Sequence, residues 1–256
     1  MIRLRSTLFS VLFFIWGTTT LVICLPLLVL PGRYTLVAGR LWTRGVMGLL
    51  AGVCGLRYEV RGLENIPAVP CIIASKHQSA WDTFVFPLLV PRISYVFKRE
   101  LTRIPLFGWY LKRAGYIPID RAGGAQALRE MVRCARERLE QGYSIVIFPE
   151  GTRVAPGQRR AYHPGTPALY SRLGVPVVPV ALNSGLFWGR DDPLKRPGVI
   201  VLEFLPPIAP GLPRKAFAAQ LERTIEAASQ RLLDEAGGAP GAGPGREAPP
   251  RDRQVL

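Results

Sequence analysis

The sequence predicts an α/β fold in which a mixed, largely parallel central sheet is flanked by helices and preceded by an N-terminal membrane-embedded helical hairpin. Three observations lead to this prediction. Short β-rich runs alternate with helical stretches from Leu56 onward. Hydrophobic residues make up 48% of the 256 residues and charged residues 20%, which excludes a mostly disordered chain. A long uncharged segment also lies near the amino terminus.

The uncharged segment comprises the 27 residues between Arg5 and Arg33. It is long enough to cross a bilayer, for which about 20 apolar residues suffice. A cleaved signal peptide is the alternative, but its apolar region usually has about 7–15 residues, and no small-x-small cleavage site follows closely. The segment is therefore interpreted as a retained anchor.

A second apolar stretch runs from Tyr34 to Leu56, after Pro26 and Pro31, which are expected to kink or end the first helix. It carries Arg40 and Arg44 at i, i+4 spacing. Two arginines on one helix face favour an interfacial helix over a full membrane span. Residues 1–56 are therefore expected to form an anchor of two apolar helices, either re-entrant or fully crossing.

The distribution of charge predicts the side of the membrane. The formal net charge is +15, and a single crossing would place everything after Arg33 outside the cell. Positive charge beside a membrane segment favours the cytoplasmic side. The arginines concerned are Arg33, Arg40, Arg44, Arg57 and Arg61. We therefore expect a hairpin in the cytoplasmic (inner) membrane, with the remaining chain facing the cytoplasm and its four cysteines reduced.

Residues 57–234 are expected to form the α/β domain. Its strand candidates are Arg57–Arg61, Cys71–Ser75, Ile93–Phe97, Gly115–Ile119, Ser144–Phe148, Val177–Ala181 and Val199–Leu205. Apolar residues at helical spacing predict one helix from Ala125 to Gln141, with Gly142 as its C-terminal cap, and another around Phe217–Leu232. The Gly/Pro/Ala-rich tail, residues 235–256, is expected to be disordered.

The first candidate for chemistry is His77, one of only two histidines, which directly follows an apolar strand. Asp82 lies five residues later, which on a continuous helix would place it about 140° away. A contact therefore requires a turn between strand and helix, and in that arrangement the carboxylate orients one ring nitrogen and leaves the other as a base. The alternative is that His77 merely caps the helix and Asp82 lies in its first turn.

The second candidate is the segment from Glu150 to Arg153, which also follows an apolar strand. Glycine allows a ligand to approach the backbone, threonine can donate a hydrogen bond, and arginine can bind phosphate in a bidentate manner. Lys98 and Arg121 lie just beyond other strands and could meet an anionic head group. The alternatives are an ordinary turn and a solvated basic surface. The other histidine, His163, is interpreted as structural or exposed.

Neither a covalent nucleophile nor a metal site is indicated. The sequence has no Gly-x-Ser-x-Gly elbow, no cysteine beside a histidine and no metal-type pairing of cysteines. A histidine base would therefore activate a substrate hydroxyl directly.

Four sequence blocks in this order resemble the glycerolipid acyltransferase family, specifically its bacterial 1-acyl-sn-glycerol-3-phosphate acyltransferases. The resemblance covers about Arg57 to Pro210. The blocks are His77 to Asp82 (H-x4-D), Gly115 to Arg121, Glu150 to Arg153 (E-G-T-R) and Val175 to Ala181. One departure is Lys76, which stands where the family commonly has asparagine.

The resemblance implies that His77 is the catalytic base and that Asp82 orients it. It also implies a set of substrate-binding residues, in which the cations bind phosphate and the other three shape the acceptor site: Lys98, Arg121, Glu150, Gly151, Thr152 and Arg153. The implied reaction transfers a fatty acyl group from acyl-CoA or acyl carrier protein to the sn-2 hydroxyl of 1-acyl-sn-glycerol-3-phosphate (lysophosphatidic acid). The product is phosphatidic acid, for phospholipid biosynthesis. No cofactor or metal is expected.

Two rival interpretations remain. One keeps the chemistry and changes the acceptor to another lysolipid, such as a lyso-ornithine lipid. The other is a non-enzymatic basic membrane- or nucleic-acid-binding protein, suggested by the net charge of +15. Nucleic-acid binding is not expected, because the arginines are scattered and the excess charge adjoins an apolar anchor. The acyl-chain length, the donor and the oligomeric state are not predicted.

Overall fold

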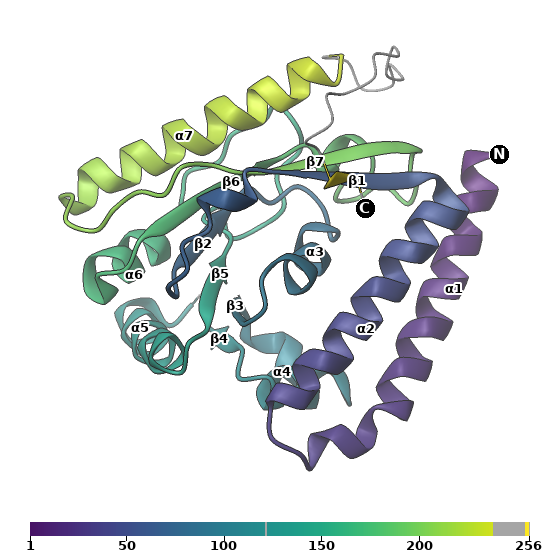
Figure 1. The fold of residues 1–256 in the computed structure, drawn as a ribbon, viewed down its shortest axis with the longest axis horizontal. Helices are drawn as coiled ribbons and strands as arrows, with labels where there is room; N and C mark the ends of the chain where they lie inside the picture. The colour runs from purple at the N-terminus through teal and green to yellow at the C-terminus, as the bar shows by residue number, and fades with distance from the viewer. Residues whose placement is uncertain (121, 238–253, 256) are drawn as a thin grey trace.

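The computed structural model describes residues 1–120, 122–237 and 254–255. Its strands form one eight-stranded sheet in the order β4-β3-β5-β2-β6-β7-β1-β8. All neighbouring strands are parallel except β6–β7 and β1–β8. The predicted mixed, largely parallel sheet flanked by helices is therefore confirmed (Figure 1).

The strand bounds agree closely with the sequence prediction. They are β1 Leu56–Arg61, β2 Ile72–Ser75, β3 Ile93–Lys98, β4 Ile117–Ile119, β5 Ser144–Ile147, β6 Val177–Leu182, β7 Gly198–Phe204 and β8 Gln254–Val255. The first seven coincide with predicted runs, and the largest difference is at β4, which begins at Ile117 rather than Gly115. The predicted tail, residues 235–256, lies largely outside the described residues.

Seven α-helices are found in the described ranges. They are α1 Ile2–Ile23, α2 Arg33–Leu49, α3 Asp82–Leu89, α4 Phe107–Arg113, α5 Gly124–Glu140, α6 Gly165–Leu173 and α7 Arg214–Glu235. The two helices predicted from periodicity correspond to α5 and α7. The sequence prediction missed α4 and α6, because a helix of seven or nine residues is too short to show a clear apolar period.

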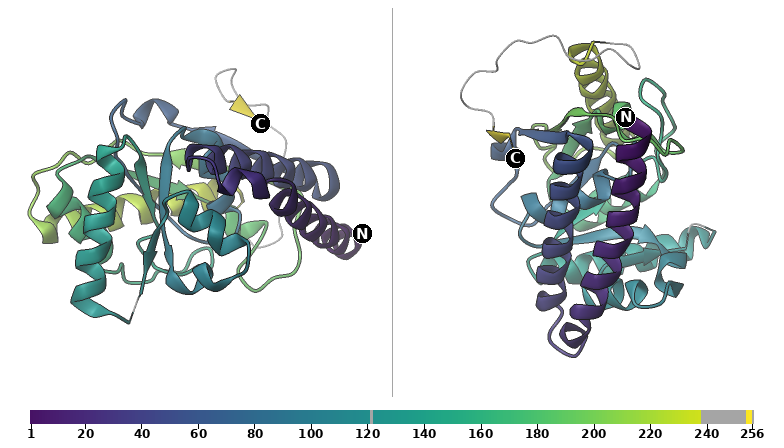
Figure 2. Two further views of the ribbon diagram at one scale, coloured as in Figure 1. Left: turned by 90° about the horizontal axis from the view of Figure 1, so that it is seen from below. Right: turned by 90° about the vertical axis from the view of Figure 1, so that its right-hand side faces the viewer.

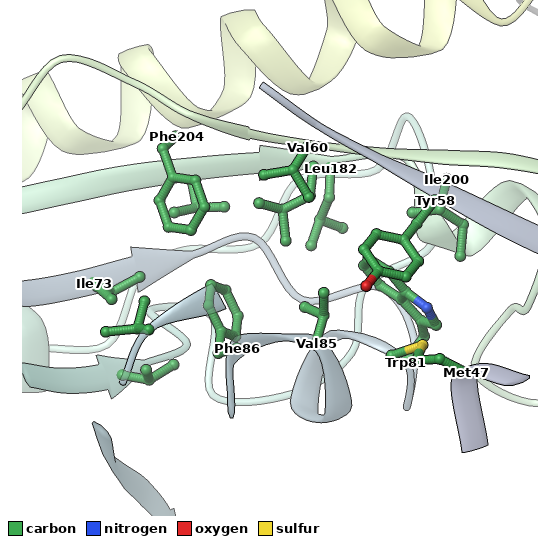
Figure 3. Close-up of a cluster of buried hydrophobic side chains, with 14 of the residues drawn as sticks. Met47, Tyr58, Val60, Ile73, Trp81, Val85, Phe86, Leu182, Ile200 and Phe204 are labelled. Carbon is green, nitrogen blue, oxygen red and sulfur yellow. The ribbon is translucent and has the colours of Figure 1, made fainter. Parts of the chain in front are cut away.

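Helices cover both faces of the sheet, and this explains the nearly continuous apolar strands. Within β2, Ile73 packs in the cluster with α2 and α3, whereas its neighbours Ile72 and Ala74 pack in the cluster with α5, α6 and α7. This alternation is the two-residue period of a strand. Figure 3 shows the first cluster, in which Phe86 of α3 lies near Ile73 and Phe204 of the sheet.

The C-terminus of α5 has the cap that its sequence predicts. Gly142 has a φ of +82°, and its N–H donates to the carbonyl of Leu139 at 2.9 Å. The next N–H, that of Tyr143, donates to the carbonyl of Arg138 at 3.0 Å. These two bonds define a Schellman motif, which turns the chain directly into β5.

The N-terminal helices form the predicted hairpin. α1 and α2 lie side by side (Figure 2, right), and the short 3-10 helix Leu25–Leu28 follows α1 before the chain turns into α2. The indole N–H of Trp16 donates to the carbonyl of Trp42 at 2.9 Å, which links the two helices. The hairpin also docks onto the α/β domain, because the Tyr110 hydroxyl on α4 donates to the Leu21 carbonyl at 2.8 Å.

Arg40 makes contacts that the expectation of an interfacial helix did not include. Its guanidinium donates to the carbonyls of Pro87, at 3.1 Å, and Pro91, at the end of α3. Arg40 therefore attaches α2 to the α/β domain, whereas Arg44 is exposed. Among the described residues, α1 is the one helix long and apolar enough to cross a membrane, which is consistent with membrane association.

Candidate active site

The site begins where β2 ends, at the centre of the sheet between β5 and β6. The chain leaves the strand after Ser75 and starts α3 at Asp82, so the intervening residues form a turn. This turn brings Nδ1 of His77 within 3.0 Å of Oδ2 of Asp82. The contact predicted across a strand–helix turn is therefore present.

Asp82 is fully buried, and both of its carboxylate oxygens are hydrogen-bonded. Besides His77, Oδ2 accepts from the backbone N–H groups of Gln78 at 2.7 Å and Ser79 at 2.8 Å. Oδ1 accepts from the Ser184 hydroxyl at 2.5 Å. This arrangement fixes the orientation of the carboxylate, which has no donor of its own.

The imidazole of His77 is held on two sides. Because a carboxylate only accepts, Nδ1 must donate to Asp82, and this leaves the lone pair of Nε2 available as a base. The ring also stacks on Phe148, with ring centroids 4.1 Å apart and planes inclined by 22°. The side chain remains 14% exposed and lines a cavity, so a substrate hydroxyl can reach it.

Glu150 lies behind the turn that holds His77 and is fully buried. Its Oε2 accepts from the backbone N–H of His77 at 3.0 Å, and its Oε1 accepts from the ammonium of Lys76 at 2.6 Å. It is not among the residues that line the cavity beside His77. The structure therefore places Glu150 against the backbone of His77 rather than in the cavity wall.

Gly151 lines the cavity and could not be replaced by a larger residue without strain. Its φ is +64°, and a Cβ placed there would lie 2.6 Å from Cδ2 of His163. Thr152 and Arg153 follow it and are partly exposed. The Arg153 carbonyl accepts from the Arg190 guanidinium at 3.3 Å.

The structure describes two of the three predicted phosphate-binding cations, and these two differ in their position relative to the cavity. Lys98 lines the cavity at the end of β3, is 51% exposed at its side chain, and lies 3.3 Å from Glu100. Arg153 is not among the cavity-lining residues. Arg121 lies outside the described residues. Of these cations, Lys98 is therefore the one that the structure describes in the wall of the cavity.

The cavity has a volume of ≈ 980 Å³ and extends from His77 to the N-terminal hairpin. Its walls are mainly apolar, and both hairpin helices contribute to them. Their contributing side chains include Phe13, Phe14, Leu21, Ala38 and Trp42. The space is at the upper end of the range of about 300–1,000 Å³ that is usual for small-molecule sites. The sequence did not indicate that the hairpin forms part of the site.

Sequence reasoning also missed two residues beside the turn that holds His77. His163 is exposed, as expected, but it lines the same cavity as His77 and covers Gly151. Lys76 is only 2% exposed and is paired with Glu150 and Glu226. Its departure from the family's asparagine was the one sequence signal that pointed to Lys76.

Comparisons with known proteins show the family and the fold. The acyltransferase family model matches residues 57–183. A 1-acyl-sn-glycerol-3-phosphate acyltransferase from Pseudomonas aeruginosa is 42% identical over 201 residues, which cover 77% of each chain. One from Limnanthes alba is 32% identical over 71% of this chain and 65% of that protein.

A solved structure gives an independent comparison of the fold. The crystal structure of the 1-acyl-sn-glycerophosphate acyltransferase PlsC from Thermotoga maritima matches with a TM-score of 0.75. The match covers 91% of this chain and 98% of that one, at 24% identity. The class defined by the fold and the site is that of the acyltransferases. The chain belongs to the acyltransferase family, among the relatives of the 1-acyl-sn-glycerol-3-phosphate acyltransferases.

Proposed function

We propose that the chain transfers a fatty acyl group from an acyl thioester to the sn-2 hydroxyl of 1-acyl-sn-glycerol-3-phosphate, giving phosphatidic acid. The observation that carries the proposal is the His77–Asp82 pair, which opens into an apolar cavity with Lys98 in its wall. The 42% identity to the Pseudomonas aeruginosa acyltransferase supports the choice of acceptor.

The proposed reaction is a direct transfer. Nε2 of His77 removes the proton of the acceptor hydroxyl while that oxygen attacks the thioester carbonyl. The carbon–sulfur bond then breaks, and the departing thiolate takes the proton back from the imidazolium. Asp82 holds the ring and stabilises its cationic form during these steps. The reaction needs neither a metal nor a cofactor, and the donor is proposed to be acyl-CoA or acyl carrier protein.

The experiment that tests the function measures acyl transfer by the detergent-purified protein. Labelled acyl-CoA and labelled acyl carrier protein are supplied separately, with lysophosphatidic acid competing against a lyso-ornithine lipid. Phosphatidic acid is the expected main product with at least one donor. Preferential acylation of the phosphate-free acceptor would instead support the rival acceptor.

The phosphate of the acceptor is proposed to be bound by Lys98 and Arg153, with Arg121 contributing. Lys98 lies in the cavity wall, and Arg153 lies two residues after Gly151, which lines the same cavity. A fixed phosphate would present the hydroxyl to His77 at reactive distance, and such positioning can supply several kcal/mol of the barrier reduction.

Arg153→Ala is expected to raise the KM for lysophosphatidic acid by about 10- to 100-fold, since a hydrogen bond to a charged group contributes about 1.5–3 kcal/mol. The kcat should change less, because the His77–Asp82 pair is intact. Steady-state kinetics with varied acceptor measure both constants. Arg129→Ala, an exposed arginine on α5, is the matched control. An unchanged KM in Arg153→Ala would exclude a role in phosphate binding.

The apolar cavity is proposed to hold the acyl chain of the donor. Gly39 of α2 lines it, and a Cβ added there would meet nothing within 4 Å. Gly39→Leu is therefore expected to fill cavity space and to shift preference toward shorter acyl donors. The measurement is kcat/KM over a series of donor chain lengths.

The same helix provides a control for this substitution. Gly48 is exposed and also has open space at its Cβ position, but it does not line the cavity. Gly48→Leu should leave the chain-length profile unchanged. Identical profiles for Gly39→Leu and the unmodified protein would contradict the proposed position of the acyl chain.

We further propose that residues 1–56 anchor the enzyme in the inner membrane and that residues 57–234 carry the reaction on its cytoplasmic side. The hairpin supports this arrangement because it forms part of the cavity wall that His77 also lines. The acceptor and the product are lipids, whereas thioester donors are cytosolic. A cavity between an apolar hairpin and the α/β domain would allow both substrates to reach the base.

A further inference from the structure

A buried ionic cluster lies behind the catalytic turn and connects three distant parts of the chain. The ammonium of Lys76 lies 2.6 Å from Oε1 of Glu150, and 2.8 and 3.0 Å from the two carboxylate oxygens of Glu226. The Tyr162 hydroxyl donates to Oε1 of Glu226 at 3.0 Å. The cluster therefore joins the end of β2, the E-G-T-R loop and helix α7.

The position of Glu226 needs an explanation. It is 7% exposed, and its neighbours Leu221, Ile225 and Ala228 belong to the apolar clusters under α7. A carboxylate on the buried face of a helix is costly unless it is paired and hydrogen-bonded. Lys76 and Tyr162 supply those partners. Lys76 in turn is 2% exposed and needs an anion of its own.

Burial, and to a smaller extent the Glu226 carboxylate, raise the pKa of Glu150 above its ordinary value, and the ammonium of Lys76 and the N–H of His77 act in the opposite direction. Burial and the Glu226 carboxylate also raise the pKa of Tyr162, which therefore stays neutral and donates its proton. Loss of Lys76 would leave two carboxylates facing each other and favour protonation of one.

Glu150 carries the effect of the cluster to the base. Its other oxygen, Oε2, accepts from the backbone N–H of His77 at 3.0 Å. A carboxylate holds an N–H more strongly than a neutral carboxylic acid does. Protonation of Glu150 would therefore loosen the backbone that aims the His77 ring at the cavity.

We infer that Lys76 and Glu226 are a pair of positioning residues, in which Lys76 holds the Glu150 carboxylate on the His77 backbone and Glu226 of α7 supplies the second counter-charge for Lys76. The pair makes α7 part of the catalytic apparatus, although that helix provides no side chain to the cavity wall. The inference rests on the proposed acyl transfer.

A double-mutant cycle tests the pair. It compares the unmodified full chain with Lys76→Met, Glu226→Gln and the double variant, measuring kcat and the acceptor KM across a range of pH. Lys76→Met should lower kcat by about 10-fold or more at a little-changed KM, since neighbours in one ionic network are strongly coupled. The double variant should recover several-fold of that loss, because it no longer places two carboxylates together.

The pH profile separates positioning from simple destabilisation. The groups facing Glu150 are Lys76, Glu226, Tyr162 and the His77 N–H, and Glu222 acts on Tyr162. In Lys76→Met the carboxyl of Glu150 should take up its proton at a higher pH. The acid limb of kcat should therefore move to higher pH, and in the double variant it should move back.

Thermal unfolding provides the readout that does not depend on activity. Lys76→Met should unfold at a lower temperature than the double variant. If Lys76→Met does not fold, the kcat and the unfolding temperature of Glu226→Gln still test the role of Glu226. Asp234→Asn, at an exposed carboxylate two turns later on α7, is the matched control and should leave kcat unchanged. Equal kcat losses and equal acid limbs in Lys76→Met and the double variant would overturn the inference. If the unmodified chain forms no phosphatidic acid, the proposed function is overturned instead. The unfolding temperatures of the four proteins then still measure the coupling between Lys76 and Glu226.

Discussion

Replacement of His77 by alanine is expected to abolish measurable acyl transfer, lowering kcat by at least ~10²–10⁴-fold, the usual contribution of a positioned acid–base group. Nδ1 of His77 is bound to Asp82 and the side chain lines the cavity, so Nε2 is the ring nitrogen left to take the hydroxyl proton. The assay measures phosphatidic acid formed from labelled donor, with thermal unfolding as the check that the variant is folded.

His163 provides the matched control for this substitution. It lines the same cavity and is exposed, but no carboxylate partner is found for it among the described residues. His163→Ala should therefore retain kcat within a few-fold of the unmodified protein. The opposite pattern, with an active His77→Ala and an inactive His163→Ala, would move the base to His163. Full turnover by both variants would exclude histidine catalysis.

The parts of the fold that sequence predicted best depend on local patterns. A strand such as β6 is buried at all six positions, so its apolar run stands out from the flanking turns. The end of α5 was predictable because Gly142 supplies the left-handed residue that a Schellman motif requires. A contact between His77 and Asp82 was one of two interpretations of their five-residue spacing, and it required the turn that the structure shows between β2 and α3.

The parts that sequence did not predict depend on contacts between distant residues. Ser184 binds the carboxylate of Asp82 from 102 positions away, and Glu226 binds Lys76 from 150 positions away. On α7, Glu226 adjoins apolar positions and gives no periodic signal of its own. Its burial becomes visible only when the end of β2 and the E-G-T-R loop are placed against that helix.

The hairpin illustrates a different limit of sequence reasoning. Its apolar composition predicted membrane association, but composition does not distinguish side chains that face lipid from those that face the α/β domain. Trp42 and Ala38 line the cavity, and Arg40 binds backbone carbonyls at the end of α3. The hairpin therefore forms a wall of the cavity and also contains α1, the helix that is long and apolar enough to cross a membrane.

Asp82→Asn is expected to lower kcat by about 10²–10⁴-fold with little loss of folding stability, which separates the charge of the carboxylate from its geometry. The asparagine oxygen can keep the place of Oδ2, which accepts from His77, Gln78 and Ser79. The amide NH₂ then faces the Ser184 hydroxyl, which can rotate to accept. The ring of His77 stays in place but loses the negative charge that stabilises its cationic form.

Ser184→Ala is the control, because it removes only the hydrogen bond to Oδ1 and leaves the charge of Asp82. Its kcat should fall by about tenfold or less, as expected for one hydrogen bond to a charged group. Steady-state kinetics and thermal unfolding of both variants make the comparison. A near-normal kcat in folded Asp82→Asn would show that a neutral acceptor suffices to orient the ring. The imidazolium would then have to be stabilised by groups other than Asp82, and the direct-transfer mechanism would lose its electrostatic basis.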